Sequence, residues 1–226
     1  MKRFLIGIAT TLLLVGASAA GQAQESSGVQ VGIDMWLNQW TQDRPGFAST
    51  TSDFVMLLGP TIEVTLPSQV FVKGSYLVST SDYTFSDVVP PFNVERQDVN
   101  AALGYWIVPG FGILAGYRDT TLNDTSSGVK DTLYGPLIGI VGDAYVDDQL
   151  SFYGRLDYLF TKFEEKDALG TFSENSPGWM VAFGVKYAFT RSFTGSFGYR
   201  YETNQGDISG INDSFSGVTF SGLFTF

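Results

Sequence analysis

The chain has 226 residues and a formal net charge of −10, and it contains neither cysteine nor histidine. This acidity argues against nucleic acid as a partner, because phosphate binding needs a basic patch. The missing residue types exclude disulfide bridges, a cysteine nucleophile and a Ser–His–Asp triad. Glycine and aromatic residues are abundant while helix caps and heptads are scarce, which is typical of a β protein of one domain.

The N-terminal segment has the pattern of a secretory signal peptide. Two basic residues precede a short apolar stretch over 4–15, and small residues follow it. We expect cleavage after Ala19 or Ala23, so that the signal peptide is 1–23 and a single domain spans 24–226. An uncleaved anchor is the weaker alternative, because a membrane-spanning helix needs roughly 20 apolar residues. No later segment approaches that length, so any membrane insertion must use strands.

After this segment, apolar and polar residues alternate with period 2 about ten times, as they do in half-buried strands. In the first of these segments Val29, Val31 and Ile33 share one face. Segments of roughly 9–14 residues suit tilted strands that cross a bilayer. We predict an antiparallel up-and-down barrel of about ten strands, with eight or twelve as alternatives. The predicted strands are 29–38, 53–66, 70–79, 97–107, 111–119, 131–145, 149–160, 178–189, 193–202 and 214–226.

The connections between these strands alternate in length. Short turns are expected at 67–69, 108–110, 146–148 and 190–192, and long polar loops at 39–52, 80–96, 120–130, 161–177 and 203–213. Bacterial barrels have short periplasmic turns and longer extracellular loops, and an even strand number. Ten strands therefore predict that both termini are periplasmic.

The short turns also predict which residues face each other across the hairpins, and such cross-strand pairs stabilise a sheet. The sixth strand is apolar on both faces, so its register with the seventh strand stays open. The predicted pairs are Glu63 with Lys73, Ile107 with Phe111, Tyr105 with Ile113, Leu103 with Ala115, Phe189 with Phe193, Val185 with Phe197 and Phe183 with Tyr199.

The last strand alternates up to an aromatic C-terminal residue. Phe220, Phe224 and Phe226 share one face, and small polar residues such as Thr219 and Ser221 share the other. This strand resembles the closing strand of Gram-negative outer-membrane β-barrels, including the small porin-like and OmpA-like barrels. In those proteins the terminal aromatic belongs to the signal that the barrel-assembly machinery reads. The resemblance implies export to the cell outer membrane, where lipid and lipopolysaccharide are partners.

The two faces of the strands differ in bulk. One face is apolar and aromatic along nearly every predicted strand, and the other is rich in Gly, Ala, Ser and Thr. This contrast favours an apolar face turned to lipid around a crowded interior. Tyrosine and tryptophan also lie near strand ends, as interfacial girdles require. The alternative, a soluble lipocalin-like barrel, would turn the same apolar face inward.

On this assignment five acidic and five basic side chains face the lumen. Unpaired charges are costly in a narrow barrel, which favours a network of salt bridges. A ring of charges around a small pore is the other interpretation. Ten strands lie closer to a filled barrel than to a wide channel. The predicted lumen residues are Asp34, Glu63, Lys73, Asp98, Arg118, Arg155, Asp157, Lys186, Arg200 and Glu202.

The sequence therefore predicts a non-enzymatic barrel, a narrow or plugged porin-like channel for small solutes, without catalytic residues, metal or cofactor. A carboxylate pair such as Asp157 and Glu202 could perform acid–base chemistry, but any two acids on the polar face would qualify equally. The alternative function is a structural or accessory subunit of a cell-surface assembly, which binds partner proteins through its long loops or lipid-facing wall.

The loops themselves suggest two kinds of contact. Their acidic residues could hold divalent cations that bridge to lipopolysaccharide, although no spacing matches a calcium loop. Their apolar residues, Phe47 and 88–92, could dock another protein or pack down into the barrel mouth.

Overall fold

The computed structural model describes residues 28–86, 92–167 and 170–226. The predicted signal peptide over 1–23 and the apolar loop residues 88–91 lie outside the described residues. Within these ranges no helix has the length and apolar character needed to cross a membrane.

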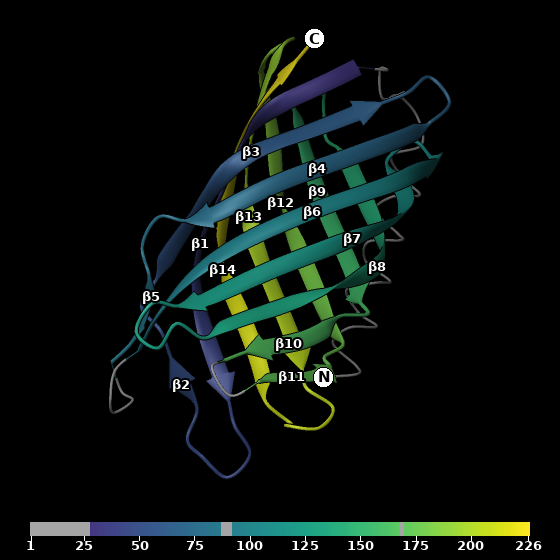
Figure 1. Ribbon diagram of the computed structural model, residues 1–226. Helices are drawn as coiled ribbons and strands as arrows, with labels where there is room; N and C mark the ends of the chain where they lie inside the picture. Colours follow the sequence, from purple (N-terminus) through teal and green to yellow (C-terminus); the bar gives the residue numbers. More distant parts are fainter. Residues whose placement is uncertain (1–27, 87–91, 168–169) are drawn as a thin grey trace.

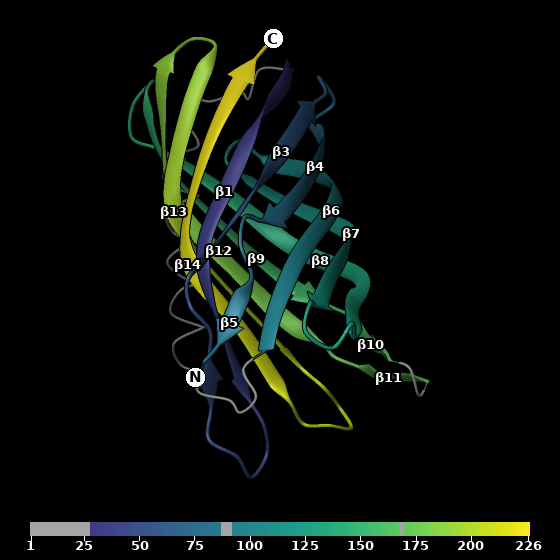
Figure 2. The ribbon, with the colours of Figure 1, turned by 60° about the vertical axis from the view of Figure 1, so that its left-hand side comes forward.

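Over the described ranges, ten long antiparallel strands close into a barrel, which confirms the predicted fold class (Figures 1 and 2). The ring closes because β1 pairs with β14 and β8 pairs with β9. The strands of the ring are β1 (Gly28–Asp43), β3 (Val55–Thr65), β4 (Val70–Ser79), β6 (Phe92–Val108), β7 (Phe111–Asp124), β8 (Lys130–Tyr145), β9 (Leu150–Leu159), β12 (Gly178–Thr190), β13 (Phe193–Gln205) and β14 (Asn212–Thr225).

Four short strands are attached to this ring at one end. β2 (Thr50–Thr51) pairs with β1, and β5 (Tyr83–Phe85) pairs with β6. β10 (Lys162–Lys166) and β11 (Thr171–Asn175) form a hairpin that extends the sheet from β8. We call this end of the barrel the loop end, and the opposite end, which carries the short turns and Phe226, the turn end (Figure 1).

The predicted loops are shorter than expected. The segment 80–96 contains β5 and the beginning of β6, and the segment 161–177 contains the β10–β11 hairpin. These stretches have polar residues on both faces, so the apolar alternation stops although the backbone pairing continues.

Five of the predicted cross-strand pairs are confirmed: Glu63 with Lys73, Tyr105 with Ile113, Leu103 with Ala115, Val185 with Phe197, and Phe183 with Tyr199. The two pairs nearest the turns are wrong, because Val108 pairs with Phe111 and Thr190 pairs with Phe193. Each turn has two residues rather than three, and a bulge in the preceding strand restores the expected register. Gly110, at φ 78°, adopts the positive φ that the first of these turns requires.

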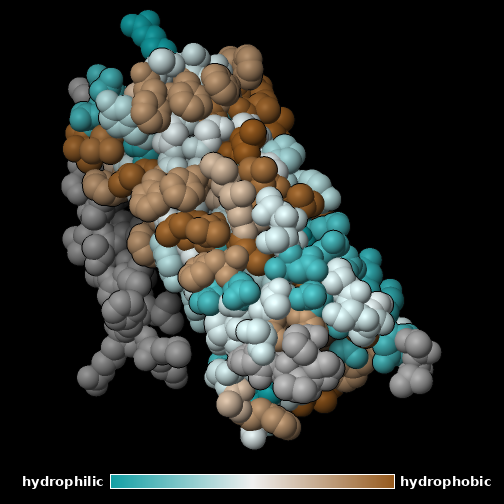
Figure 3. Space-filling view, turned by 90° about the vertical axis from the view of Figure 1, so that its left-hand side faces the viewer, coloured by the Kyte–Doolittle hydropathy of each residue, from teal (hydrophilic) through white to brown (hydrophobic). Residues whose placement is uncertain are grey.

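The outer surface of the barrel is apolar and the inner face of the wall is buried. Exposed outward residues include Ile33, Leu103 and Phe183, whereas Trp36 and Leu57 point inward and are buried. Figure 3 shows apolar residues gathered over the half of the surface nearer the turn end, and polar residues nearer the loop end. This arrangement is the reverse of a soluble lipocalin-like barrel and matches a barrel that faces lipid.

We expect Phe226→Ala to lower the efficiency of membrane insertion while leaving the stability of the refolded barrel nearly unchanged. The Phe226 side chain is 83 % exposed, so its removal gives up little packing. The backbone N–H of Phe226 still donates to the carbonyl oxygen of Val29 at 2.9 Å. Insertion is measured as the folded fraction in outer membranes, and stability as urea unfolding of refolded protein.

The matched control for this prediction is Phe189→Ala, because Phe189 is a similarly exposed aromatic near the turn end but lies outside the last strand. Equal insertion defects in the two variants would contradict a signal specific to the C-terminal strand.

Candidate functional site

A buried ion network fills the lumen towards the loop end. Arg96 on β6 donates to Asp98 from Nε at 2.9 Å, and its Nη2 lies 3.3 Å from Oε1 of Glu202 on β13. Arg118 on β7 donates to the same Oε1, and Arg200 donates to Oε2 at 2.8 Å. Arg96, Arg118, Asp98 and Glu202 are almost completely buried. The network therefore ties β6 and β7 to β13 across the lumen.

Aromatic rings hold two of these arginines. The guanidinium carbon of Arg96 lies 4.0 Å from the ring centroid of Phe215 and 5.1 Å from that of Trp36. The guanidinium carbon of Arg200 lies 4.1 Å from the Trp36 ring. Cation–π contacts of this kind are strongest where water is excluded, so the rings stabilise the buried cations and occupy the space between them.

An apolar cluster lies against the network on its loop-end side. The short strand β5 places Tyr83 and Phe85 in the barrel mouth, where both are fully buried. The Tyr83 hydroxyl donates to Oδ1 of Asn38 at 2.7 Å. Phe92 stacks on Phe85 with ring centroids 4.5 Å apart, so this residue, predicted to lie in a loop, is the first residue of β6 and packs into the mouth. Phe47, by contrast, is 79 % exposed.

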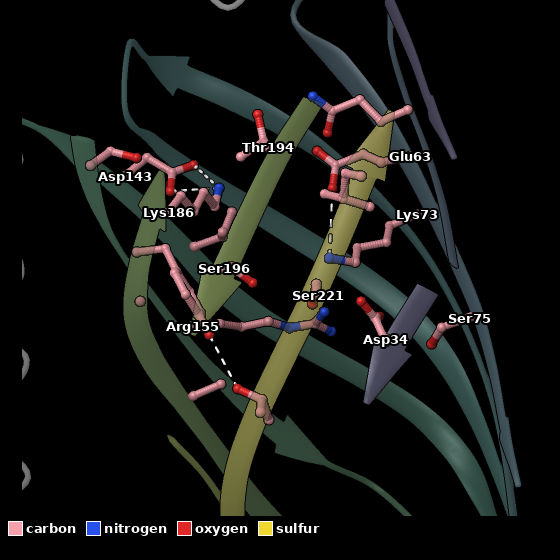
Figure 4. Close-up of a pocket in the computed structure, with 18 of the residues that line it drawn as sticks. Asp34, Glu63, Lys73, Ser75, Asp143, Arg155, Lys186, Thr194, Ser196 and Ser221 are labelled. Carbon is pink, nitrogen blue, oxygen red and sulfur yellow. Dashed lines mark hydrogen bonds and ion pairs between the residues drawn. The ribbon is translucent and has the colours of Figure 1, made fainter. Parts of the chain in front are cut away.

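A cavity of about 470 Å³ occupies the turn-end half of the lumen. Three ion pairs line it, and Figure 4 shows two of them, Lys73 with Glu63 and Lys186 with Asp143, on opposite sides of the cavity. The three pairs are Lys73 with Glu63 at 3.6 Å, Lys186 with Asp143 at 2.7 Å, and Arg155 with Asp157 at 2.7 Å. Trp36, Arg118 and Arg200 also line the cavity, so it meets the buried network at its floor.

The ten lumen residues predicted from the sequence are divided between these two regions. Asp98 and Glu202 belong to the buried network, Arg118 and Arg200 belong to the network and to the cavity floor, and Asp34, Glu63, Lys73, Arg155, Asp157 and Lys186 line the cavity. The prediction missed Arg96 and Asp143, and Asp147 and Asp148 of the turn after β8 also line the cavity. Arg96 lies on the same face of its strand as Asp98. It would have been included if the strand predicted over 97–107 had been started at residue 92, where β6 begins.

The two carboxylates considered for acid–base chemistry are both engaged. Asp157 accepts hydrogen bonds from Nε of Arg155 at 3.0 and 2.9 Å, and Glu202 accepts from Arg96, Arg118 and Arg200. Neither group offers a free oxygen to a substrate. Among the residues with described positions, no group of three or more acidic side chains is arranged to hold a metal ion.

Glu174, an acidic residue at the loop end, accepts local hydrogen bonds. Glu174 on β11 accepts from the backbone N–H groups of Ile208 and Ser209 at 2.7 and 2.8 Å. Burial raises the pKa of Glu174, but the hydrogen bonds from Ser209 and Ile208 outweigh it, so the pKa lies below the usual range. This carboxylate fastens one loop to another and is not available to bridge lipopolysaccharide through a cation.

Asp131 on β8 is a loop-end acid whose pKa is shifted in the opposite direction from that of Glu174. It is the second residue of β8, it pairs across strands with Glu165 on β10, and its buried Oδ1 has no hydrogen-bond partner. Burial, together with the nearby charges of Glu165, Asp213 and Asp124, raises the pKa of Asp131 to about 7 in spite of Arg44.

This pKa predicts that the loop end is less stable at alkaline pH. The folded-state pKa of Asp131 lies above its ordinary value, so the stabilisation is present at low pH and is lost as pH rises through about 7. We expect Asp131→Asn to raise the free energy of unfolding by about 1–2 kcal/mol at pH 8, after allowance for solvent screening. At about pH 3, where the carboxyl is protonated in the folded and the unfolded chain alike, the variant and the parent protein should be equally stable.

The check is urea unfolding at both pH values, with hydrogen exchange in β10 as the local readout. Asp147→Asn serves as the control, because Asp147 lies in the turn after β8 at the other end of the barrel, accepts hydrogen bonds from the backbone N–H groups of Gln149 and Leu150, and has a lowered pKa. A gain for Asp131→Asn that is the same at both pH values would contradict titration of this carboxyl.

An outward apolar belt, a closed antiparallel ring and a charged interior together define an outer-membrane β-barrel. The chain belongs to the outer membrane protein beta-barrel domain family, whose family model matches residues 9–224. Localisation to the cell outer membrane follows from this membership. No curated protein matches the chain in a sequence search.

Solved structures of other bacterial barrels share the fold. The outer membrane protease OmpT from Escherichia coli aligns with a TM-score of 0.63 and 12 % identity, over 92 % of this chain and all of that one (100 %). The translocator domain of the autotransporter NalP from Neisseria meningitidis aligns with a TM-score of 0.47 and 11 % identity, over 99 % of this chain and 96 % of that one. Neisserial surface protein A aligns with a TM-score of 0.46 and 12 % identity, over 85 % of this chain and 95 % of that one. At 12 % identity the OmpT alignment shows a shared fold, and a fold alone assigns no activity.

Proposed function

We propose that the protein is a non-enzymatic outer-membrane barrel whose lumen is plugged towards the loop end, with the loops outside the cell and both termini in the periplasm. The observation that carries this proposal is the ion network that Arg96 and Arg118 form with Glu202 across the lumen, at nearly zero exposure to solvent. A water-filled pore hydrates the charges that line it, whereas these charges are dry.

The neighbouring aromatic cluster supports the same conclusion. Trp40 stacks with Phe215 at 5.2 Å between ring centroids and meets Phe85 edge to face at 4.9 Å. These rings cover the network from the loop end. Small barrels are commonly filled by their own side chains, and in this chain the filling is supplied by the wall strands and by β5.

Single-channel recording of the refolded full chain in a planar bilayer tests the plug. We expect no stable openings from protein shown to be folded. Glu63→Gln and Arg155→Gln should be equally silent, because both residues lie on the cavity side of the plug. Stable openings whose conductance changes with these two substitutions would overturn the proposal and make solute passage the function.

A second candidate function is that of an accessory subunit in a cell-surface assembly. Supporting it, Phe47 and Ile208 are large apolar side chains that are 79 % and 73 % exposed at the loop end. Affinity purification from native outer membranes tests this role. A partner that is retained by the parent chain and by Phe226→Tyr, but lost from Phe47→Ser with Ile208→Ser, would support it; identical recovery from all three would count against it.

A further inference from the structure

The cavity at the turn end has two unlike walls. On the β6–β8 side, Trp106, Leu114 and Leu137 belong to a buried apolar cluster. On the opposite side, β13 and β14 contribute Thr194, Ser196, Thr219 and Ser221. Because the hydroxyl side chains are short, they leave the cavity open on their side, and the apolar cluster forms the wall on the other side. Ligand sites typically combine an apolar surface with a few convergent polar groups, within about 300–1,000 Å³, and this cavity has both.

In three of the ion pairs around the cavity the basic side chain is more exposed than the acidic one. The side chain of Lys186 is 36 % exposed while that of its partner Asp143 is 1 % exposed. Arg155 and Asp157 show the same order at 21 % and 1 %, and Arg200 and Glu202 at 15 % and 0 %. The carboxylates lie behind the cations in each pair. A molecule near β9 and β12 therefore meets Lys186 and Arg155 first, while the acids Asp34 and Glu63 line the opposite side of the cavity.

We propose that this cavity binds a small amphipathic organic anion, a carboxylate attached to an apolar group. Its carboxylate would lie near Lys186 and Arg155, and its apolar part would contact the wall that contains Trp106 and Leu137. The inference goes beyond the plug, because a cavity with a closed floor takes up a molecule from one side without passing it on.

Asp34 sets the orientation of such a ligand. It is a cavity acid without an ion-pair partner among the described residues, and Figure 4 shows it on the opposite side from Lys186 and Asp143. Repulsion from Asp34 would keep an anionic head near β9 and β12, where the exposed bases are. The hydroxyl groups of Ser196 and Ser221 are available as donors along that path.

The test measures the binding of three probes of similar size to the full chain in nanodiscs by isothermal titration calorimetry, with empty nanodiscs as the blank. Phenylbutanoate is the anion, phenylbutanamide the neutral control and phenylbutylamine the cation. We expect saturable binding of the anion about tenfold tighter than that of the amide, and weaker binding still of the amine, since charge-assisted hydrogen bonds are the stronger ones. Equal affinity for anion and amide, preference for the amine, or no saturable binding would overturn the proposal.

Variants then locate the site. Lys186→Gln with Asp143→Asn removes one exposed cation and its buried counter-charge together, which avoids leaving an unpaired carboxylate. We expect this double variant to bind phenylbutanoate about fivefold or more weakly. Lys162→Gln, an exposed lysine on β10 at the loop end, is the control and should bind as the parent does. Ser196→Leu should abolish binding by filling the cavity; unchanged affinity there would place the ligand elsewhere and overturn the assignment.

Discussion

Glu202→Gln is expected to destabilise the folded barrel by about 3–5 kcal/mol, the cost of leaving buried charge without its partner. Glu202 accepts hydrogen bonds from Arg96, Arg118 and Arg200, and no water reaches its side chain. Glutamine keeps the shape but removes the negative charge that these arginines share. Urea unfolding of the refolded protein in lipid measures the loss, and bilayer recording shows whether the plug now admits ions.

The matched control is Glu63→Gln, in which the same chemical change is made to an ion pair that solvent reaches. The Glu63 and Lys73 side chains are 22 % and 37 % exposed, and their charged atoms lie 3.6 Å apart. Such a pair contributes about 0–1 kcal/mol. Similar losses in the two variants would mean that the network around Glu202 is not a desolvated plug.

Val185→Arg is expected to cost about 2–4 kcal/mol, the penalty for a cation on the lipid face near mid-bilayer. Val185 on β12 pairs with Phe152 on β9 and Phe197 on β13, which are both exposed on the outer surface. Trp179, Phe183 and Tyr187 lie on the same outward face of β12 and are exposed there as well. Folding into lipid vesicles measures the penalty.

The comparison for Val185→Arg is Ser196→Arg, because Ser196 faces the cavity and its new side chain would have water beside it. We expect this lumenal change to cost clearly less. A neutral Val185→Arg together with a ruinous Ser196→Arg would reverse the assignment of inside and outside.

The strands were predictable from the sequence because lipid and lumen impose opposite chemistry on alternate residues. Val29, Val31 and Ile33 illustrate this on β1, where each is exposed on the outer surface. The same signal fails near the turns, where the bulges at Ile107 and Phe189 shift the pairing by one residue. A bulge adds one residue to a strand, so the predicted pairs hold on the side of the bulge away from the turn and fail between the bulge and the turn.

The composition of the lumen was predictable, but its connections were not. Arg96 was missed because β6 continues past the membrane, where apolar residues no longer mark the outer face. Asp143 was missed because β8 is apolar on both faces. The alternation along a strand predicts that a charged residue faces the lumen, but it does not predict which strand of the barrel lies across the lumen from it. The cross-lumen contact of Arg96 with Glu202, 106 positions apart, depends on that closure.

The contacts between opposite walls also have a mechanical consequence. A hollow tube ovalises easily under lateral pressure, whereas a tube with internal braces keeps its cross-section. Arg96 and Arg118 reach from β6 and β7 to Glu202 on β13 and so act as braces of this kind. A change in bilayer tension or thickness should therefore tilt this barrel as a rigid body, and the surface loops should move with it without being squeezed or spread.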